Sequence, residues 1–185
     1  WANANIPIPP CFIIVCNNTT TSKLVYDYIS GFERENSNGD IEVVPGKLEL
    51  FRNYDENGNA FGRPRTLLID SGQLESGDAL DANFSKAAGK EIELFRREVL
   101  ERTGDHKQAD NISEADLLRE VMNTVGQQGK LGESIRCVVS VSMLTEGWDA
   151  NTVTHVLGVR AFGTQLLCEQ VMGRALRRQS YQLNE

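Results

Sequence analysis

The sequence predicts an α/β fold in which helices cover both faces of a mostly parallel sheet. Short apolar runs without alternation recur along the chain, a pattern typical of strands that are covered on both faces. These runs are residues 11–16, 66–70, 135–141 and 154–159. The segments between them carry apolar residues at three- and four-residue steps, which predicts helices. Alternation of such strands and helices indicates a parallel sheet with helices packed on it.

The first strand leads directly into a helix. After the apolar run 11–16 comes the polar segment 17–22, which is rich in asparagine, threonine and serine. These residue types favour the start of a helix because their side chains accept hydrogen bonds from its free amides. We expect the helix to continue through residues 24–29 and to end at Gly31.

Residues 31–64 interrupt this alternation and are interpreted as an insertion in a single domain of residues 1–185. Two short runs, 41–44 and 48–51, flank Pro45-Gly46 and predict a hairpin, whereas 54–64 has the polar composition of an exposed loop.

Three further helices are expected in the second half of the chain. Helical periodicity extends over 81–102 and stops at Gly104. Ser113-Glu114-Ala115-Asp116 fits a capping box, so a second helix should begin there and end at Gly126. The last helix is expected to begin at Thr164.

Composition restricts the class of protein. The chain has 185 residues, of which 40% are hydrophobic, and its net charge is −7. A domain of this length can bury a core without disulfides or metal, and the negative charge excludes a surface that is basic throughout. No apolar run is long enough to span a membrane.

The four cysteines favour a reduced, cytoplasmic protein. They are widely spaced, and with only two histidines in the chain they form no zinc pattern. We interpret them as buried thiols and expect no metal ligands. They are Cys11, Cys16, Cys137 and Cys168. His155 lies in an apolar run and is interpreted as a core histidine.

Three polar segments follow predicted strands: 17–22, 142–149 and 160–164. Ligands of open α/β sheets gather at the carboxyl ends of the strands, so these segments should meet at one edge.

The last predicted helix carries paired arginines. Successive residues of a helix are about 100° apart, so polar groups and a glycine fall on one narrow stripe of this helix. The residues on the rest of its circumference, which include Met172, can bury against the sheet. The stripe consists of Leu166, Gln170, Gly173, Arg174 and Arg177. Two guanidiniums one turn apart suit a phosphate chain, and Gly173 suggests close approach of a ligand or another backbone. The alternative is a solvated basic face near a helix C-terminus.

The segment after the third strand offers a second set of polar groups. In it, Gly147 permits close backbone approach, Thr145 offers a hydroxyl and Asp149 can accept from ribose hydroxyls. The alternative is an ordinary turn with a capping aspartate.

Together these segments resemble known motifs. Thr145-Glu146-Gly147-Trp148-Asp149 and Gln170-x-x-Gly173-Arg174-x-x-Arg177 resemble motifs V and VI of superfamily 2 helicases and translocases. The sequence around both motifs looks closest to that of the Res subunit of type III restriction enzymes. Residues 12–21 occupy the place of motif IV. The resemblance implies the second RecA-like domain of an ATP-dependent DNA motor.

The resemblance also implies roles for single residues. Arg177 would reach the γ-phosphate, with Arg174 beside it and Gln170 coupling hydrolysis to domain closure; these are the catalytic candidates. Gly147, Asp149 and Gly173 would face the nucleotide. Contacts to the nucleic-acid backbone would come from Thr145 and from Asn17, Asn18 and Thr19.

The sequence contains no G-x-x-x-x-G-K-[ST] phosphate loop, which such a motor carries in its first domain. The resemblance therefore implies three partners: that first domain, which would hold ATP and Mg²⁺, DNA, and a modification methyltransferase subunit. On this interpretation the chain alone is inactive. Residues 160–178 hold four arginines and one acid, a local charge of +3 in a chain of −7. The alternative function is a free-standing module that binds nucleotide or single strands without catalysis.

Overall fold

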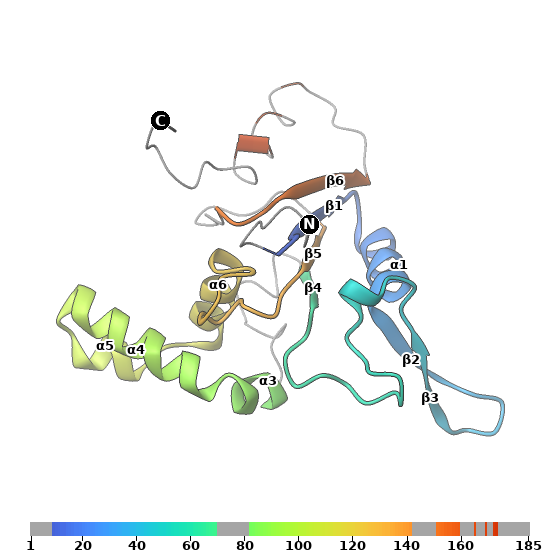
Figure 1. Ribbon diagram of the computed structural model, residues 1–185, viewed down its shortest axis with the longest axis horizontal. Coiled ribbons are helices and arrows are strands. Elements are labelled where there is room, and N and C mark those ends of the chain that lie inside the picture. The colour runs from blue at the N-terminus through green and yellow to red at the C-terminus, as the bar shows by residue number, and fades with distance from the viewer. Residues whose placement is uncertain are drawn as a thin grey trace.

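The computed structural model describes residues 9–69, 82–141 and 151–159, together with Gln165, Glu169, Met172 and Gly173. Its centre is a four-stranded sheet in the order β4-β5-β1-β6 (Figure 1). The strands are β1 (Phe12–Cys16), β4 (Thr66–Ile69), β5 (Cys137–Ser140) and β6 (His155–Val159). Every neighbouring pair is parallel. The predicted α/β fold with a parallel sheet is confirmed.

Helices cover both faces of this sheet. Successive side chains of a strand point to opposite sides, so a strand without polar alternation presents apolar side chains on both faces. Helix α1 (Thr19–Ser30) lies on one side and α6 (Glu114–Asn123) on the other (Figure 1). From β1, Ile13 and Val15 join the core on the α6 side, and Ile14 joins the core on the α1 side. Ile13 and Val15 are buried on one face and Ile14 and Cys16 on the other, which explains why the apolar run has no polar alternation.

The turn between β1 and α1 forms as its residue types predict. Asn18 caps the helix, and its Oδ1 accepts from the amide of Thr21 at 2.7 Å. The helix ends at Gly31, whose φ of 90° lies in the region that glycine tolerates best.

The hairpin within residues 31–64 is not where the sequence predicted it. Strand β2 (Gly31–Glu35) pairs antiparallel with β3 (Ile41–Pro45), whereas the segment after Pro45 forms the short 3₁₀ helix η2 (Glu49–Phe51). Phe51 is buried in the α1-side core, so η2 packs toward α1 instead of pairing with β3. Strand β2 escaped prediction because most of its side chains are charged and exposed. Residues 54–64 form a loop with one bridge, Tyr54 to Ala60.

The helices of the second half follow the predicted order. The periodic segment divides into α3 (Ala82–Ala87) and α4 (Gly89–Thr103), and α4 ends at Gly104 as expected. The sequence did not predict the short helix α5 (His106–Asp110). Helix α6 begins at the predicted capping box: the Asp116 amide donates to Ser113 Oγ, and the Ser113 amide donates to Asp116 Oδ2, each at 3.1 Å. The predicted end at Gly126 was wrong: the helix ends at Asn123, where the Thr124 amide closes the last turn on the carbonyls of Glu120 and Val121.

Cys11, Cys16 and Cys137 are free, buried thiols, which confirms the prediction for these three; Cys168 lies outside the described residues. Of the helices that the structure describes, none has both the length and the hydropathy to cross a membrane.

Candidate functional site

The candidate site lies at the edge where β5, β1 and β6 end. These three strands are adjacent and parallel, so their carboxyl ends share one edge of the sheet. The strands before the three polar segments therefore end together, while the meeting of the segments themselves stays a prediction. Segments 142–149 and 160–164 themselves lie outside the described residues.

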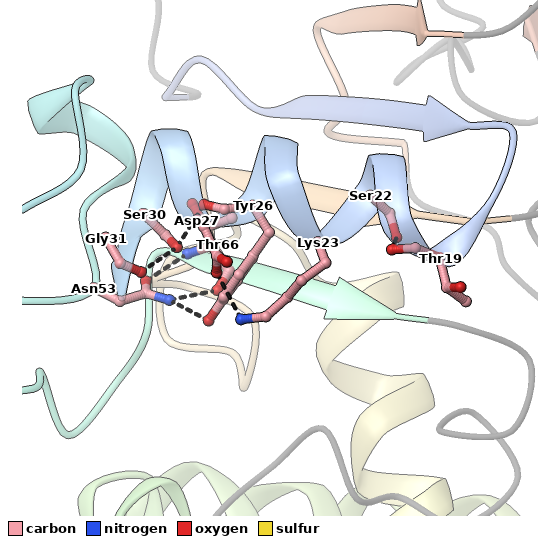
Figure 2. A network of polar contacts seen from close by, with 9 residues as sticks. All are labelled: Thr19, Ser22, Lys23, Tyr26, Asp27, Ser30, Gly31, Asn53 and Thr66. Atoms are coloured by element: carbon pink, nitrogen blue, oxygen red, sulfur yellow. Dashed lines mark hydrogen bonds and ion pairs between the residues drawn. The ribbon is translucent and has the colours of Figure 1, made fainter. Parts of the chain in front are cut away.

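The first polar segment is exposed at this edge. Asn17, Asn18 and Thr19 are all exposed at the start of α1. Asn18 is committed to its capping bond, and the carbonyl of Thr19 accepts from Ser22 Oγ at 2.9 Å (Figure 2). The first turn of α1 contains no acidic residue. The partial positive charge of a helix N-terminus is therefore not offset by a carboxylate of that turn, so this position favours anions.

The predicted motif V residues Thr145, Gly147 and Asp149 lie outside the described residues, but the chain is anchored on either side of them. Before them, the Val141 amide donates to the Ile69 carbonyl at 3.3 Å. After them, Thr154 Oγ1 both donates to the Cys11 carbonyl and accepts from the Cys11 amide, each at 2.9 Å. The two anchors fix where the segment leaves β5 and where it enters β6.

Four residues of the last predicted helix are described, and all are exposed. Gln165 Nε2 donates to Glu169 Oε1 at 2.6 Å, a spacing typical of a helix. Gln170, Arg174 and Arg177 lie outside the described residues.

No described neighbour lies close enough to Gly173 to require a glycine at this position. A Cβ built at Gly173 would meet no described atom within 4 Å. Close approach of another described backbone therefore does not account for this glycine, and a nucleotide contact stays a prediction.

The prediction that Met172 can bury against the sheet was wrong, because its side chain is 51% exposed. At 100° per residue Met172 lies only about 20° from Gln165 around the helix, so it shares that exposed side.

The prediction of a core histidine at position 155 was also wrong. His155 is exposed, and its ring stacks on Phe12 of the neighbouring strand with 4.3 Å between centroids and 4° between planes. Its Nδ1 lies 2.7 Å from Thr154 Oγ1. β6 forms an edge of the described sheet, so a side chain on it can stack on β1 without being enclosed.

The structure also contains a buried polar network that the sequence did not predict (Figure 2). Asn53, in the insertion, bonds to Tyr26 of α1 and to the backbone of Arg65 and Thr66 at the start of β4. A single asparagine in a polar loop gives no sequence signal for such a role.

The sequence also did not predict a pocket that is lined by arginines at the opposite edge of the sheet.

Among the side chains that the structure describes, no group of three or more histidine, cysteine, aspartate or glutamate residues could hold a metal ion. Comparison with protein-family models, with curated proteins and with solved structures finds no match for this chain.

Proposed function

We propose that this chain is the second motor domain of an ATP-dependent DNA helicase or translocase, within the Res subunit of a type III restriction endonuclease. In this role it supplies Arg174 and Arg177 to ATP held by a first RecA-like domain, and it contacts the DNA backbone. Gln170 couples hydrolysis to closure of the two domains. The protein acts in the cytoplasm together with a modification methyltransferase subunit.

The observation that carries the proposal is the parallel alignment of β5, β1 and β6. Residues 145–149 follow β5 in the sequence, residues 170–177 follow β6, and Asn17–Thr19 follow β1. The residues that resemble motifs IV, V and VI are thus connected to the same edge of one sheet. Open α/β sheets bind ligands at this edge.

The chemistry assigned to this chain is stabilisation of charge. In transfer of the γ-phosphoryl group to water, negative charge develops on the phosphoryl oxygens, and an arginine placed against them raises the rate about a thousandfold or more in other phosphoryl-transfer systems. The 185 residues lack a phosphate loop, so they do not fit a Mg²⁺–ATP site by themselves. The proposal assigns Mg²⁺, which neutralises phosphate charge when bound, to the first domain.

Arg177→Ala tests the proposal in the whole protein of which the chain is proposed to be one domain. We expect DNA-stimulated ATP hydrolysis to fall about a hundredfold or more, with ATP binding largely unchanged, because a finger acts mainly in the transition state. Turnover measured with saturating DNA, and nucleotide binding measured by titration, separate these effects.

Arg178→Ala is the matched control, since it removes the same charge about 100° around the predicted helix. Equal losses in both variants would indicate a general charge effect, and unchanged turnover in Arg177→Ala would refute the finger assignment.

The alternative is a free-standing module that binds nucleotide or single strands without hydrolysis. It is favoured by the missing phosphate loop and by the N-terminus of α1, whose first turn contains no carboxylate. Saturable binding of single-stranded DNA to the isolated chain, with no ATP hydrolysis by the whole protein under any DNA condition, would support this alternative over the motor.

A further inference from the structure

A pocket of about 580 Å³ opens at the amino-terminal edge of the sheet. Arg65 directly precedes β4 and Arg136 directly precedes β5, so the pocket lies at the opposite edge from the candidate motor site. Its volume is within the range of small-molecule sites. Its main lining residues are Leu50, Phe61, Arg63, Arg65, Ser134 and Arg136.

Backbone hydrogen bonds hold two of these arginines next to each other. The Arg65 carbonyl accepts from the amides of Arg136, at 2.7 Å, and Cys137, at 3.0 Å. Asn53 Oδ1 accepts from the Arg65 amide at 2.8 Å. Arg65 and Arg136 therefore line the same pocket from backbone that is held in place.

Neutral groups orient both guanidiniums. Arg65 Nη1 donates to the Glu49 carbonyl at 3.1 Å, and its guanidinium lies over the Phe61 ring, 4.7 Å from the centroid. Arg136 Nη1 donates to the carbonyls of Glu133, at 2.6 Å, and Ile135, at 3.0 Å. These contacts restrict the side chains without neutralising their charge.

The third arginine of the pocket, Arg63, differs because a carboxylate pairs with it. Arg63 Nη1 forms an ion pair with Glu91 at 2.9 Å, and Nη2 donates to the carbonyls of Lys130 and Leu131. No carboxylate of residues 9–69, 82–141 or 151–159 forms an ion pair with Arg65 or Arg136. The nearby carboxylate of Glu133 accepts from the Gly129 amide at 2.9 Å. Two oriented positive charges therefore share one pocket in a chain whose net charge is −7.

We propose that this pocket binds a small organic phosphate. The phosphate group lies between Arg65 and Arg136, since guanidiniums bind phosphate oxygens through paired, charge-assisted hydrogen bonds. Leu50 and Phe61 form the apolar wall against which the organic part of the ligand packs. Ser134 Oγ already donates to the Pro64 carbonyl at 3.0 Å, so the proposal assigns it no bond to the phosphate. The site is separate from the proposed motor function and does not depend on it.

Phenyl phosphate is a suitable probe because it combines a phosphate with an aromatic group. We expect saturable binding to the 185-residue chain below about 10 mM, at least about tenfold tighter than inorganic phosphate or benzoate. Arg65→Ala and Arg136→Ala should each raise the dissociation constant about tenfold or more. Chemical-shift titration measures the affinity and shows whether the signals of Phe61 and Leu50 respond.

Arg97→Ala is the control for loss of one positive charge elsewhere, because Arg97 is exposed on α4. The affinity of this variant for phenyl phosphate should stay within about twofold of that of the parent chain. Arg65→Lys and Arg136→Lys keep the charge and guard against loss of folding; they should still weaken binding several-fold, because an ammonium cannot bind bidentately.

Three results would overturn the proposal: no saturable binding, equal weakening in Arg97→Ala, or unchanged affinity in the Arg65 and Arg136 variants. Tighter binding of a short single-stranded oligonucleotide that displaces phenyl phosphate would overturn the small-ligand assignment in favour of a nucleic-acid surface.

Discussion

At the scale of single residues, Asn53 shows how one side chain connects three parts of the molecule. Its Oδ1 accepts from the amides of Arg65 and Thr66, and its Nδ2 donates to the Thr66 carbonyl and to Tyr26 Oη, at 2.8–3.0 Å. All hydrogen-bonding positions of the amide are thereby used. Since the residue is only 8% exposed, water cannot readily replace these partners.

Asn53→Ala should lower the free energy of unfolding by about 2–4 kcal/mol, because it leaves buried backbone groups of β4 without partners. Urea denaturation followed by circular dichroism measures the loss. Asn57→Ala, at an exposed position of the same loop, should change stability by less than about 0.5 kcal/mol. Similar values for both variants would show that the network contributes no specific stability.

The sequence could not identify such residues. Asn53 and Asn57 are the same residue type in the same polar segment, and only the packing of α1 against β4 distinguishes them. His155 was misassigned for a related reason: an apolar run predicts a strand but does not show whether that strand lies at an edge.

At the scale of elements, the junction between α1 and the β2–β3 hairpin depends on two glycines. Gly46 follows β3 and crosses the end of α1, and a Cβ there would lie 2.1 Å from the Ile29 carbonyl oxygen. Gly31, which joins α1 to β2, has a φ of 90°, and a Cβ there would lie 2.8 Å from the Val44 carbonyl oxygen. The backbones approach each other here more closely than any side chain permits.

Gly46→Ala should therefore destabilise the protein by about 3 kcal/mol or more, because backbone must move to remove the overlap. Gly89→Ala is the matched control: a Cβ at this first residue of α4 meets no described atom within 4 Å. That variant should be neutral or more stable by up to about 1 kcal/mol. Thermal unfolding of both variants compares them, and a stable Gly46→Ala protein would contradict the close crossing.

Elements with a strong local signal were predicted well. The capping box at Ser113, the polar segment 17–22 that contains the N-cap Asn18, and the C-terminal glycine at Gly104 each act through neighbours in the sequence, so the sequence identifies them. The hairpin was misplaced because β2 contains mostly charged residues, and only its pairing with β3 makes it a strand.

At the scale of the whole molecule, the buried cysteines link stability to pH. Burial raises the pKa of the Cys11 thiol from 9.0 to about 11, and burial also raises the pKa of Cys137. The folded state therefore keeps protons that the unfolded chain loses. Below pH 9 both states are protonated and these thiols do not change stability with pH. Above it, ionisation of the unfolded chain favours unfolding.

We expect the free energy of unfolding to fall as the pH rises from about 9 toward 11, with Cys11 contributing up to about 1.4 kcal/mol for each pH unit. Urea denaturation at a series of pH values measures this slope. Because tyrosine and lysine titrate in the same range, the informative quantity is the difference between the parent chain and Cys11→Ala, whose slope should be shallower. Equal slopes would contradict the raised pKa.

The sequence by itself determined the fold class, the order of the strands and main helices along the chain, and those helix ends that carry a local capping signal. These properties follow from local periodicity and from hydrogen bonds between close neighbours in the chain. It also carries the motif resemblance from which the motor function is proposed. Only the tertiary structure decided the strand order β4-β5-β1-β6, the pairing of β2 with β3, the Asn53 network and the pocket of Arg65 and Arg136. Each of these features joins residues that are distant in the sequence or that carry no distinguishing signal of their own. No local sequence pattern therefore predicts these features.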